Sequence, residues 1–250
     1  MFTTKKWAEL PDTKKNLWAF PVHCQNCGIR LLGAAKQICR YCILSELARI
    51  YPEPKKGMYP EGVEWQIACW RYDEAHLIQR LMHRLKHNGA YDIGVDLGRA
   101  AAELFQQAHP KKYGELMLER PLLVPVPLSQ QRRDSRGYNQ SYSIAEGWVA
   151  AMPLPILREG SIARRASRIN QVHVNKSERR LNMEGVYRLA CPSVYDWINR
   201  PILITDDVYT TGSTCFALWQ FLKSLGFKKT YLFTLAMEIG SSTRMTPRHE

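Results

Sequence analysis

Residues 201–215 read Pro-Ile-Leu-Ile-Thr-Asp-Asp-Val-Tyr-Thr-Thr-Gly-Ser-Thr-Cys, and this stretch decides the fold. The run 202–205 is apolar and β-branched without polar alternation, which is typical of a buried parallel strand. Two carboxylates follow it, and then come small residues whose backbone can approach a ligand closely. From Phe216 apolar residues recur at helical spacing up to Gly226, which predicts a helix that ends there. The expected order is therefore strand, acidic turn, small-residue loop and helix.

This stretch has the properties of a sugar phosphate site. A helix N-terminus offers free N–H groups and a positive dipole end, which together bind phosphate. Asp206 and Asp207 would repel a bare phosphate, but carboxylates accept hydrogen bonds from a vicinal diol. A sugar phosphate satisfies both requirements, with its hydroxyls on the acids and its phosphate on the small-residue loop. The alternative is an ordinary strand-to-helix turn in which the two aspartates only cap the helix. The expected phosphate-binding residues are Thr210, Thr211, Gly212, Ser213 and Thr214.

The composition is that of a globular protein with a large excess of positive charge. The 250 residues include 35 lysines and arginines against 23 acids, a formal charge of +12, and 45% are hydrophobic. Such a charge suits an anionic ligand, a nucleic acid or a membrane surface without choosing among them. No apolar run approaches the roughly 18 residues of a spanning helix, and the N-terminus lacks the apolar core of a secretion signal. We therefore expect a cytoplasmic protein with no membrane insertion.

Four of the seven cysteines form two Cys-x2-Cys pairs, Cys24 with Cys27 and Cys39 with Cys42. Two such knuckles supply the four thiolates of a tetrahedral zinc site, and Gly28 permits the tight turn that a knuckle needs. The alternative is four unrelated buried or redox-active cysteines. The segment is too short to build a core alone, so we expect a structural Zn²⁺ to supply much of its folding energy. Residues 51–62, rich in proline and glycine, are expected to link it to the main domain.

The remaining periodicity predicts further strands and helices. Strands are expected at 65–69, 122–126 and 230–236, and helices at 74–86, 92–108 and around 144–149. Pro125 and Pro127 cannot donate to a sheet ladder, so the second of these strands must end there or lie at an edge. The tail at 240–250 should fray. The strand–helix repetition after about residue 120 favours a parallel sheet.

A basic loop follows the proline-broken strand. Arg132, Arg133 and Arg136 come just beyond a strand end, where open α/β sheets bind ligands, and guanidinium groups pair well with pyrophosphate. The alternative is a solvated basic loop. Residues 129–180 carry ten lysines and arginines against four acids. Lys86, at the end of a predicted helix, could reach the same anion or be a plain C-terminal charge.

With these pieces in order, the chain resembles the ComF family of competence-associated, phosphoribosyltransferase-like proteins, which includes members called GntX and ComFC. The resemblance covers nearly the whole length. It rests on the paired cysteines, Leu85-Lys86 with Gly89, Val124-Pro-Val-Pro127, Arg136-Gly-Tyr-Asn-Gln140, Gln171, Arg179, Asn182, Gly185 and the segment 206–214. It implies a type I phosphoribosyltransferase fold after a four-cysteine zinc ribbon: 1–60 as ribbon and linker, and 61–250 as the transferase-like domain. Within that domain it implies a hood at about 61–118 and a core at about 119–240, with 128–137 as pyrophosphate loop and 158–180 as lid.

The first functional hypothesis is an enzyme that uses 5-phosphoribosyl-1-pyrophosphate (PRPP) with Mg²⁺. Asp206 and Asp207 would hold the ribose as the catalytic residues, with Asp207 the nearest candidate for a general base. The loop after them would hold the 5′-phosphate, and the arginines with Lys86 the pyrophosphate. Electrostatic stabilisation of the leaving group would supply most of the catalysis. The acceptor pocket is expected in the region around 65–90.

The second hypothesis is a nucleic-acid-binding module without turnover, and a third is a PRPP-responsive regulator. Single-stranded DNA binding combines basic grooves with stacking aromatic residues. The resemblance also suggests a role in DNA uptake, with other competence proteins such as a DNA translocase as partners. The basic candidates are Arg164, Arg165, Arg168, Arg179 and Arg180, and the aromatic candidates are Tyr138, Tyr142 and Trp148.

Overall fold

The computed structural model describes residues 22–31, 35–47, 62–72, 76–87, 89–165 and 185–238. The predicted linker lies outside these residues except for Gly62, and so does the tail at 240–250. Arg168, Arg179 and Arg180 also lie outside the described residues, as does most of the predicted lid.

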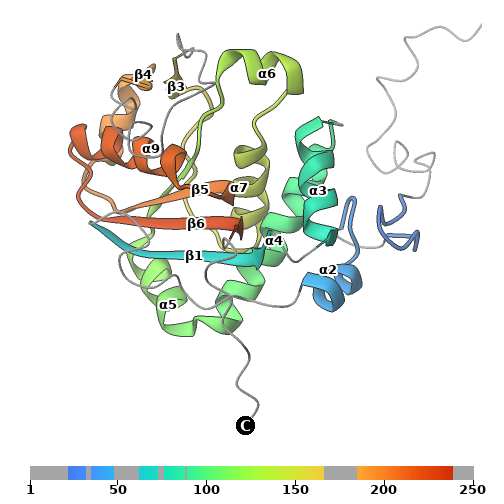
Figure 1. The fold of residues 1–250 in the computed structure, drawn as a ribbon. Coiled ribbons are helices and arrows are strands. Elements are labelled where there is room, and N and C mark those ends of the chain that lie inside the picture. Colours follow the sequence, from blue (N-terminus) through green and yellow to red (C-terminus); the bar gives the residue numbers. More distant parts are fainter. Residues whose placement is uncertain are drawn as a thin grey trace, which may run out of the picture.

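A four-stranded parallel sheet forms the centre of the molecule (Figure 1). Its strands are β1 (Val63–Arg71), β2 (Leu122–Pro125), β5 (Ile202–Tyr209) and β6 (Thr230–Met237), in the order β1-β6-β5-β2. Every neighbouring pair is parallel, which confirms the predicted α/β class. The strand β2 lies at an edge and ends at Pro125, as its prolines require.

Helices cover both faces of this sheet. On one face lie α3 (His76–His87), α4 (Tyr91–Ala108), α5 (Pro110–Glu119) and α7 (Gln140–Ala151), and α9 (Ser213–Ser224) covers the other (Figure 1). The α9 face also carries the two-stranded antiparallel hairpin of β3 (Ile162–Arg164) and β4 (Tyr187–Leu189), and the 3₁₀ helix η3 (Pro192–Trp197). The cysteine-rich segment contributes α2 (Arg40–Leu47), whose buried residues join the core of the α3–α4 face.

The helices α4 and α7 approach each other backbone to backbone through glycines. A Cβ added at Gly98 would lie 2.0 Å from the Ile144 carbonyl oxygen, and one at Gly147 would lie 2.0 Å from the Val95 carbonyl oxygen. A side chain larger than hydrogen therefore cannot fit at either position without moving a helix. Around this contact, Phe105, Trp148 and other aromatic side chains fill the core under β5 and β6.

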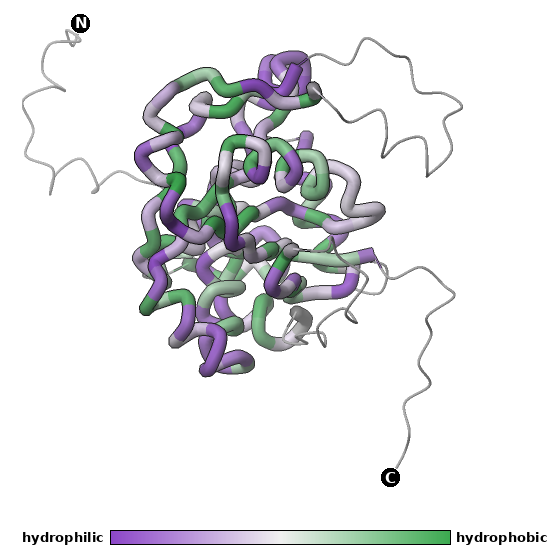
Figure 2. The backbone as a smooth tube through the Cα atoms, turned by 90° about the vertical axis from the view of Figure 1, so that its left-hand side faces the viewer, coloured by the Kyte–Doolittle hydropathy of each residue, from purple (hydrophilic) through white to green (hydrophobic). Residues whose placement is uncertain are grey.

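Several expectations about secondary structure were wrong in detail. The strand predicted for 202–205 continues to Tyr209, so both aspartates lie on β5 and not in a turn. The predicted basic loop after β2 contains a short helix, α6 (Gln130–Arg136), which ends at Gly137 with a left-handed φ of 80°. This helix is hydrophilic along its length and projects at the top of the molecule (Figures 1 and 2). The helix α5 and the β3–β4 hairpin had no counterpart in the prediction.

Candidate functional site

The carboxylate of Asp206 is directed into the protein. It is 8% exposed, and its Oδ1 accepts hydrogen bonds from the Ser141 hydroxyl at 2.8 Å and from the Asp207 amide at 2.9 Å. Its Oδ2 lies 3.9 Å from the thiol sulfur of Cys215. Ser141 stands in the first turn of α7, whose Asn139 cap accepts from the Ser141 amide and donates to the Val126 carbonyl. The sequence indicated no role for Ser141, which ties this acid to the helix after the basic loop.

Burial changes the acidity of Asp206. Burial raises the pKa of this carboxyl to about 7, and the neighbouring Asp207 carboxylate adds to the increase. The Ser141 hydroxyl, the Asp207 amide and Lys86 act in the opposite direction. Asp206 is therefore protonated in a large fraction of molecules near neutral pH, unlike an ordinary aspartate, which titrates near 3.9.

Asp207 points to the opposite side of the strand. Its Oδ2 lies 2.9 Å from Nζ of Lys86, which reaches it from the last turn of α3, and its Oδ1 accepts from the Val208 amide at 2.7 Å. Lys86 is about a quarter exposed, so this ion pair lies at the rim of the protein interior and open to a ligand. The sequence left open whether Lys86 binds a ligand or is a plain charge at the end of a helix. In the structure it lies in the last turn of α3 and forms an ion pair with Asp207.

The loop after β5 turns through Gly212 before α9 begins. Gly212 has a left-handed φ of 69°, and a Cβ there would lie 2.1 Å from the Tyr209 hydroxyl oxygen. Glycine is therefore required both by the backbone conformation and by the packed tyrosine. The hydroxyls of Thr211 and Ser213 lie 2.9 Å apart in a mutual hydrogen bond. The helix α9 of 12 residues starts at Ser213, so its first amides face this loop.

A cavity of about 220 Å³ opens at this edge of the sheet. It brings together residues that are up to 142 positions apart in sequence, from Tyr72 to Thr214, including residues of α3, α6, α7, β5 and the start of α9. The predicted ligand residues that line it are Lys86, Arg132, Arg136, Asp206, Asp207, Thr210 and Thr214. Burial lowers the pKa of the Arg136 guanidinium, with a further contribution from Arg132, while Asp207 opposes the change. Both acids and four cations, Lys86, Arg132, Arg136 and Arg164, therefore line one small space.

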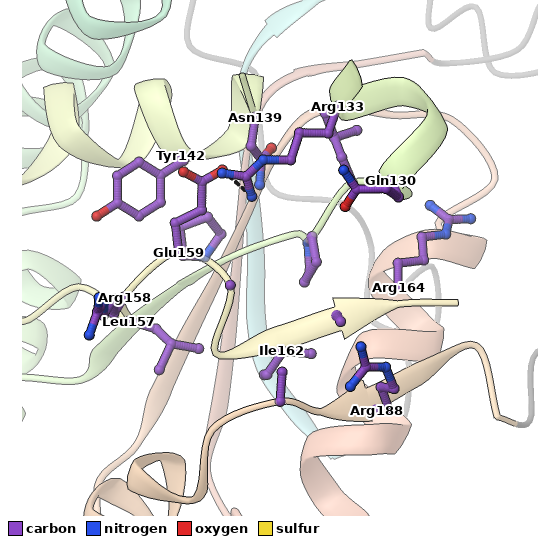
Figure 3. Close-up of a pocket in the computed structure, with 16 residues that line it drawn as sticks. Gln130, Arg133, Asn139, Tyr142, Leu157, Arg158, Glu159, Ile162, Arg164 and Arg188 are labelled. Carbon is purple, nitrogen blue, oxygen red and sulfur yellow. Dashed lines mark ion pairs between the residues drawn. The ribbon is translucent and has the colours of Figure 1, made fainter. Parts of the chain in front are cut away.

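Arg133, which the sequence grouped with Arg132 and Arg136, turns to the other side of α6. Its Nη1 lies 3.2 Å from Oε1 of Glu159, and it lines a second cavity of about 400 Å³ (Figure 3). Arg164 of β3 lines both cavities. Arg165, the next basic candidate, is exposed. Trp148 is 1% exposed within the core, so the prediction that it could stack on a nucleobase was wrong.

The four predicted metal ligands lie together. The Sγ atoms of Cys24 and Cys42 are 3.8 Å apart, those of Cys27 and Cys39 are 3.7 Å apart, and all four lie within 4.8 Å of one another. A tetrahedral ion with Zn–S bonds of about 2.3 Å requires sulfur–sulfur separations of about 3.8 Å. The cluster therefore fits a metal such as zinc. Gly28 has a φ of 75°, as the tight turn of the first knuckle requires.

A buried carboxylate fixes the second knuckle to the main body. Asp96 on α4 is 4% exposed and accepts from the amides of Lys36 at 2.9 Å, Gln37 at 2.6 Å and Ile38 at 2.9 Å. The first knuckle is held by α3, because Arg84 donates to the Gln25 carbonyl and side chain at 3.2 and 2.8 Å. Sequence reasoning missed Asp96. The available signal was an acid three residues after inward-facing Ile93 on an otherwise apolar helix face.

The parallel sheet, the small-residue loop after two acids and the four-cysteine segment define an α/β protein of the phosphoribosyltransferase-like class with an N-terminal zinc-ribbon-type cluster.

No protein-family model matches the chain. Among curated proteins, "Competence protein F" of Haemophilus influenzae is 27% identical over 228 residues, 89% of this chain and 87% of the relative. "Competence protein ComFC" of Streptococcus pneumoniae is 28% identical over 216 residues, 85% of this chain and 86% of the relative. "DNA utilization protein YhgH" of Escherichia coli O157:H7 is 30% identical over 158 residues, 63% of this chain and 66% of the relative. The chain belongs to the ComF family.

In the described part of the chain, none of the helices combines the length and the apolar character that crossing a bilayer requires.

Proposed function

We propose that this protein acts in natural competence and DNA utilisation as a PRPP-binding, phosphoribosyltransferase-like protein. The names of the relatives, which refer to competence and to DNA utilisation, support the first part. The observation that carries the second part is the cavity in which Asp207 and Lys86 face Arg136 across the carboxyl edge of the sheet. Ligands of open α/β sheets bind at this edge.

The charges of the cavity match the parts of PRPP. The ribose diol requires hydrogen-bond acceptors. Both acids are buried, but Oδ1 of Asp206 already accepts from Ser141 and the Asp207 amide, whereas Oδ2 of Asp207 meets Lys86 at the cavity, so Asp207 is the better candidate. Pyrophosphate requires cations, and Arg132, Arg136 and Lys86 would supply them. The 5′-phosphate would lie between Thr210 and the first amides of α9. Mg²⁺ would enter as the magnesium complex of PRPP and neutralise part of the pyrophosphate charge.

The pairing of Lys86 with Asp207 suggests how the free protein keeps these charges in place. Without ligand, each side chain neutralises the other at 2.9 Å. A bound ligand that offers hydroxyls to Asp207 and phosphate oxygens to Lys86 would satisfy both groups at once. In a transfer reaction the same cations would stabilise the departing pyrophosphate, and Asp207 would lie beside the sugar as positive charge develops there.

Calorimetric titration with Mg-PRPP tests this proposal. Asp207→Asn and Arg136→Gln should each weaken binding about tenfold to a hundredfold, as expected for loss of a charged hydrogen bond. Arg133→Gln is the matched comparison, since it removes the same charge from the same helix but on the other side. Lys228→Gln, an exposed charge on another loop, serves as a neutral control. Absence of PRPP binding, or equal losses in all four variants, would refute the assignment.

A second candidate function is single-stranded DNA binding, and it is compatible with the first. It is favoured by the arginines at the β3–β4 hairpin, where Arg164 borders both cavities and Arg165 is exposed. A titration with oligothymidine at several salt concentrations measures phosphate contacts directly, because each contact lowers the affinity as salt rises. An affinity that does not change with salt would exclude this function.

A further inference from the structure

The second cavity has no role in the proposed PRPP site. It lies on the far side of α6, between that helix, the start of α7, and the β3–β4 hairpin (Figure 3). Its volume of about 400 Å³ falls in the range of small-molecule sites, which is roughly 300–1,000 Å³. The PRPP cavity and this one share Pro127, Leu128 and Arg164 as lining residues. The two cavities are therefore neighbours divided by α6.

The charged groups of this cavity are unevenly distributed. Figure 3 shows Arg164 and Arg188 on the hairpin side, with Gln130 above them, and Tyr142, Leu157 and Arg158 on the opposite side. Glu159 is the single acid in the lining, and it is paired with Arg133. Within the part of the chain that the structure describes, Arg158, Arg164 and Arg188 form no ion pair. The cavity thus has a net positive charge, and the two guanidinium groups at its hairpin end have no carboxylate partner among the described residues, although that of Arg164 lies 6.0 Å from the centre of the Tyr187 ring.

The remaining lining is apolar or aromatic. Leu157 and Ile162 are 7% and 4% exposed and belong to the core of the α9 face, so they form a fixed floor. Asn139 beside them already uses its side chain in the cap of α7, which makes that wall rigid. Tyr142 contributes a partly exposed ring at the end away from the hairpin. An apolar floor with an aromatic ring at one end and arginines at the other matches a ligand that has a flat ring and a phosphate.

We propose that this cavity is a second ligand site, which binds a nucleotide with its phosphate on Arg164 and Arg188 and its base between Tyr142 and Leu157. The chemistry of recognition is that of one nucleotide unit, and a free mononucleotide or a nucleotide within single-stranded DNA could supply it. Guanidinium groups bind phosphate oxygens bidentately, and the ring offers a stacking surface to any base.

The position of this site couples it to the PRPP cavity. The helix α6 is the shared wall: Arg132 and Arg136 face one cavity, and Gln130 and Arg133 face the other. A β-bridge between Ser129 and Arg164 joins the hairpin to the residue just before α6. A nucleotide that draws Arg164 toward its phosphate would therefore remove one cation from the edge of the PRPP cavity. Binding of the two ligands should then be linked, and by thermodynamic reciprocity each should change the affinity of the other by the same factor.

The test uses the full-length protein with thymidine monophosphate, thymidine, inorganic phosphate and oligothymidine as separate probes in calorimetry. Arg188→Gln removes a guanidinium that lines the second cavity but not the PRPP cavity. This variant should bind thymidine monophosphate or oligothymidine at least about tenfold more weakly, as expected for loss of a charged hydrogen bond, with PRPP affinity in the absence of nucleotide unchanged. Lys228→Gln, which removes an exposed charge elsewhere, should bind all probes like the wild type.

The titrations distinguish a free nucleotide from DNA as the source of the ligand, and they include results that would overturn the proposal. A loss confined to oligothymidine identifies DNA as the source of the nucleotide, and a loss with thymidine monophosphate identifies a free nucleotide. The proposal is overturned if the wild type binds neither probe, or if Arg188→Gln binds both as tightly as the wild type does. Equal affinity for inorganic phosphate and thymidine monophosphate overturns the assigned base position, and Tyr142→Leu checks it independently. Because Arg188 does not line the PRPP cavity, failure of this site leaves the PRPP titrations unaffected.

Discussion

The inward position of Asp206 leads to a prediction about stability that is independent of any ligand. Its carboxyl is buried, close to Asp207, and its pKa is raised to about 7. Between the unfolded pKa of about 3.9 and this value, the folded protein binds more protons at Asp206 than the unfolded chain does. The free energy of unfolding contributed by this residue must therefore fall as pH rises through that window, and it levels off above pH 7.

The size of this effect follows from the two pKa values. A group that shifts from about 3.9 to about 7 lowers the unfolding free energy by about 2 kcal/mol between about pH 5.5 and about pH 8.5. Asp206→Asn removes the titration while retaining an oxygen that can accept from Ser141 and the Asp207 amide. The variant should be at least as stable as the wild type at the alkaline end, and the difference between the two proteins should shrink as pH falls.

Urea unfolding of both proteins across this pH range measures the difference directly, so other titrating groups cancel. Asp196→Asn, an exposed aspartate on η3, is the control and should follow the wild type at every pH. If the difference between Asp206→Asn and wild type stays constant with pH, or if the wild type gains stability relative to the variant as pH rises, then Asp206 is already ionised and burial does not raise its pKa.

Three further outcomes follow from the packing. Gly98→Ala should destabilise the fold by about 1–3 kcal/mol in the same urea assay, because the added Cβ would lie 2.0 Å from a carbonyl oxygen of α7. Gly114→Ala is the control, and it should be neutral or slightly stabilising because nothing lies within 4 Å of the added Cβ. Asp96→Asn should speed metal release to a chromogenic chelator, because three backbone amides lose a charged acceptor. Asp92→Asn should leave the rate of metal release unchanged, because the ion pair of Asp92 with Lys36 is exposed. Chelation of the metal should also weaken PRPP binding, and equal PRPP affinity with and without metal would contradict this.

The sequence predicted those parts of the fold where a residue type, such as proline or a pair of cysteines, restricts the local structure to one outcome. Proline in β2 indicated an edge or an end, and both are present. The cysteine spacing indicated a four-ligand cluster because its geometry is local. Elements without an apolar face gave no such signal. The helix α6 buries none of its residues, and of the residues in α5 the one that is buried is Leu116.

The two acids of β5 show the consequence of predicting a strand that is too short. Ending the strand at Thr205 assigned both aspartates the same role in a turn. Consecutive residues of a strand point to opposite faces, so continuing it to Tyr209 separates them. Leu203 belongs to the core of the α3–α4 face, and Asp207, four residues later, points to the same side and reaches Lys86. Ile204 belongs to the core of the α9 face, and Asp206, two residues later, approaches Cys215 on that side. Alternation carried two residues further would have predicted the difference, but the contact with Ser141 depends on tertiary packing.

The helix α3 connects the cysteine cluster to the proposed PRPP cavity through side chains only a few residues apart. Arg84 holds the first knuckle at the Gln25 carbonyl, and two residues later Lys86 reaches Asp207. Between them, the Leu85 carbonyl accepts a hydrogen bond from the Tyr138 hydroxyl, which ties the helix to the chain just after α6. Because interiors are close-packed, these three consecutive residues near the end of α3 move together. The knuckle therefore sets the position from which Lys86 meets Asp207, and the cysteine segment forms part of the support of the proposed ligand site.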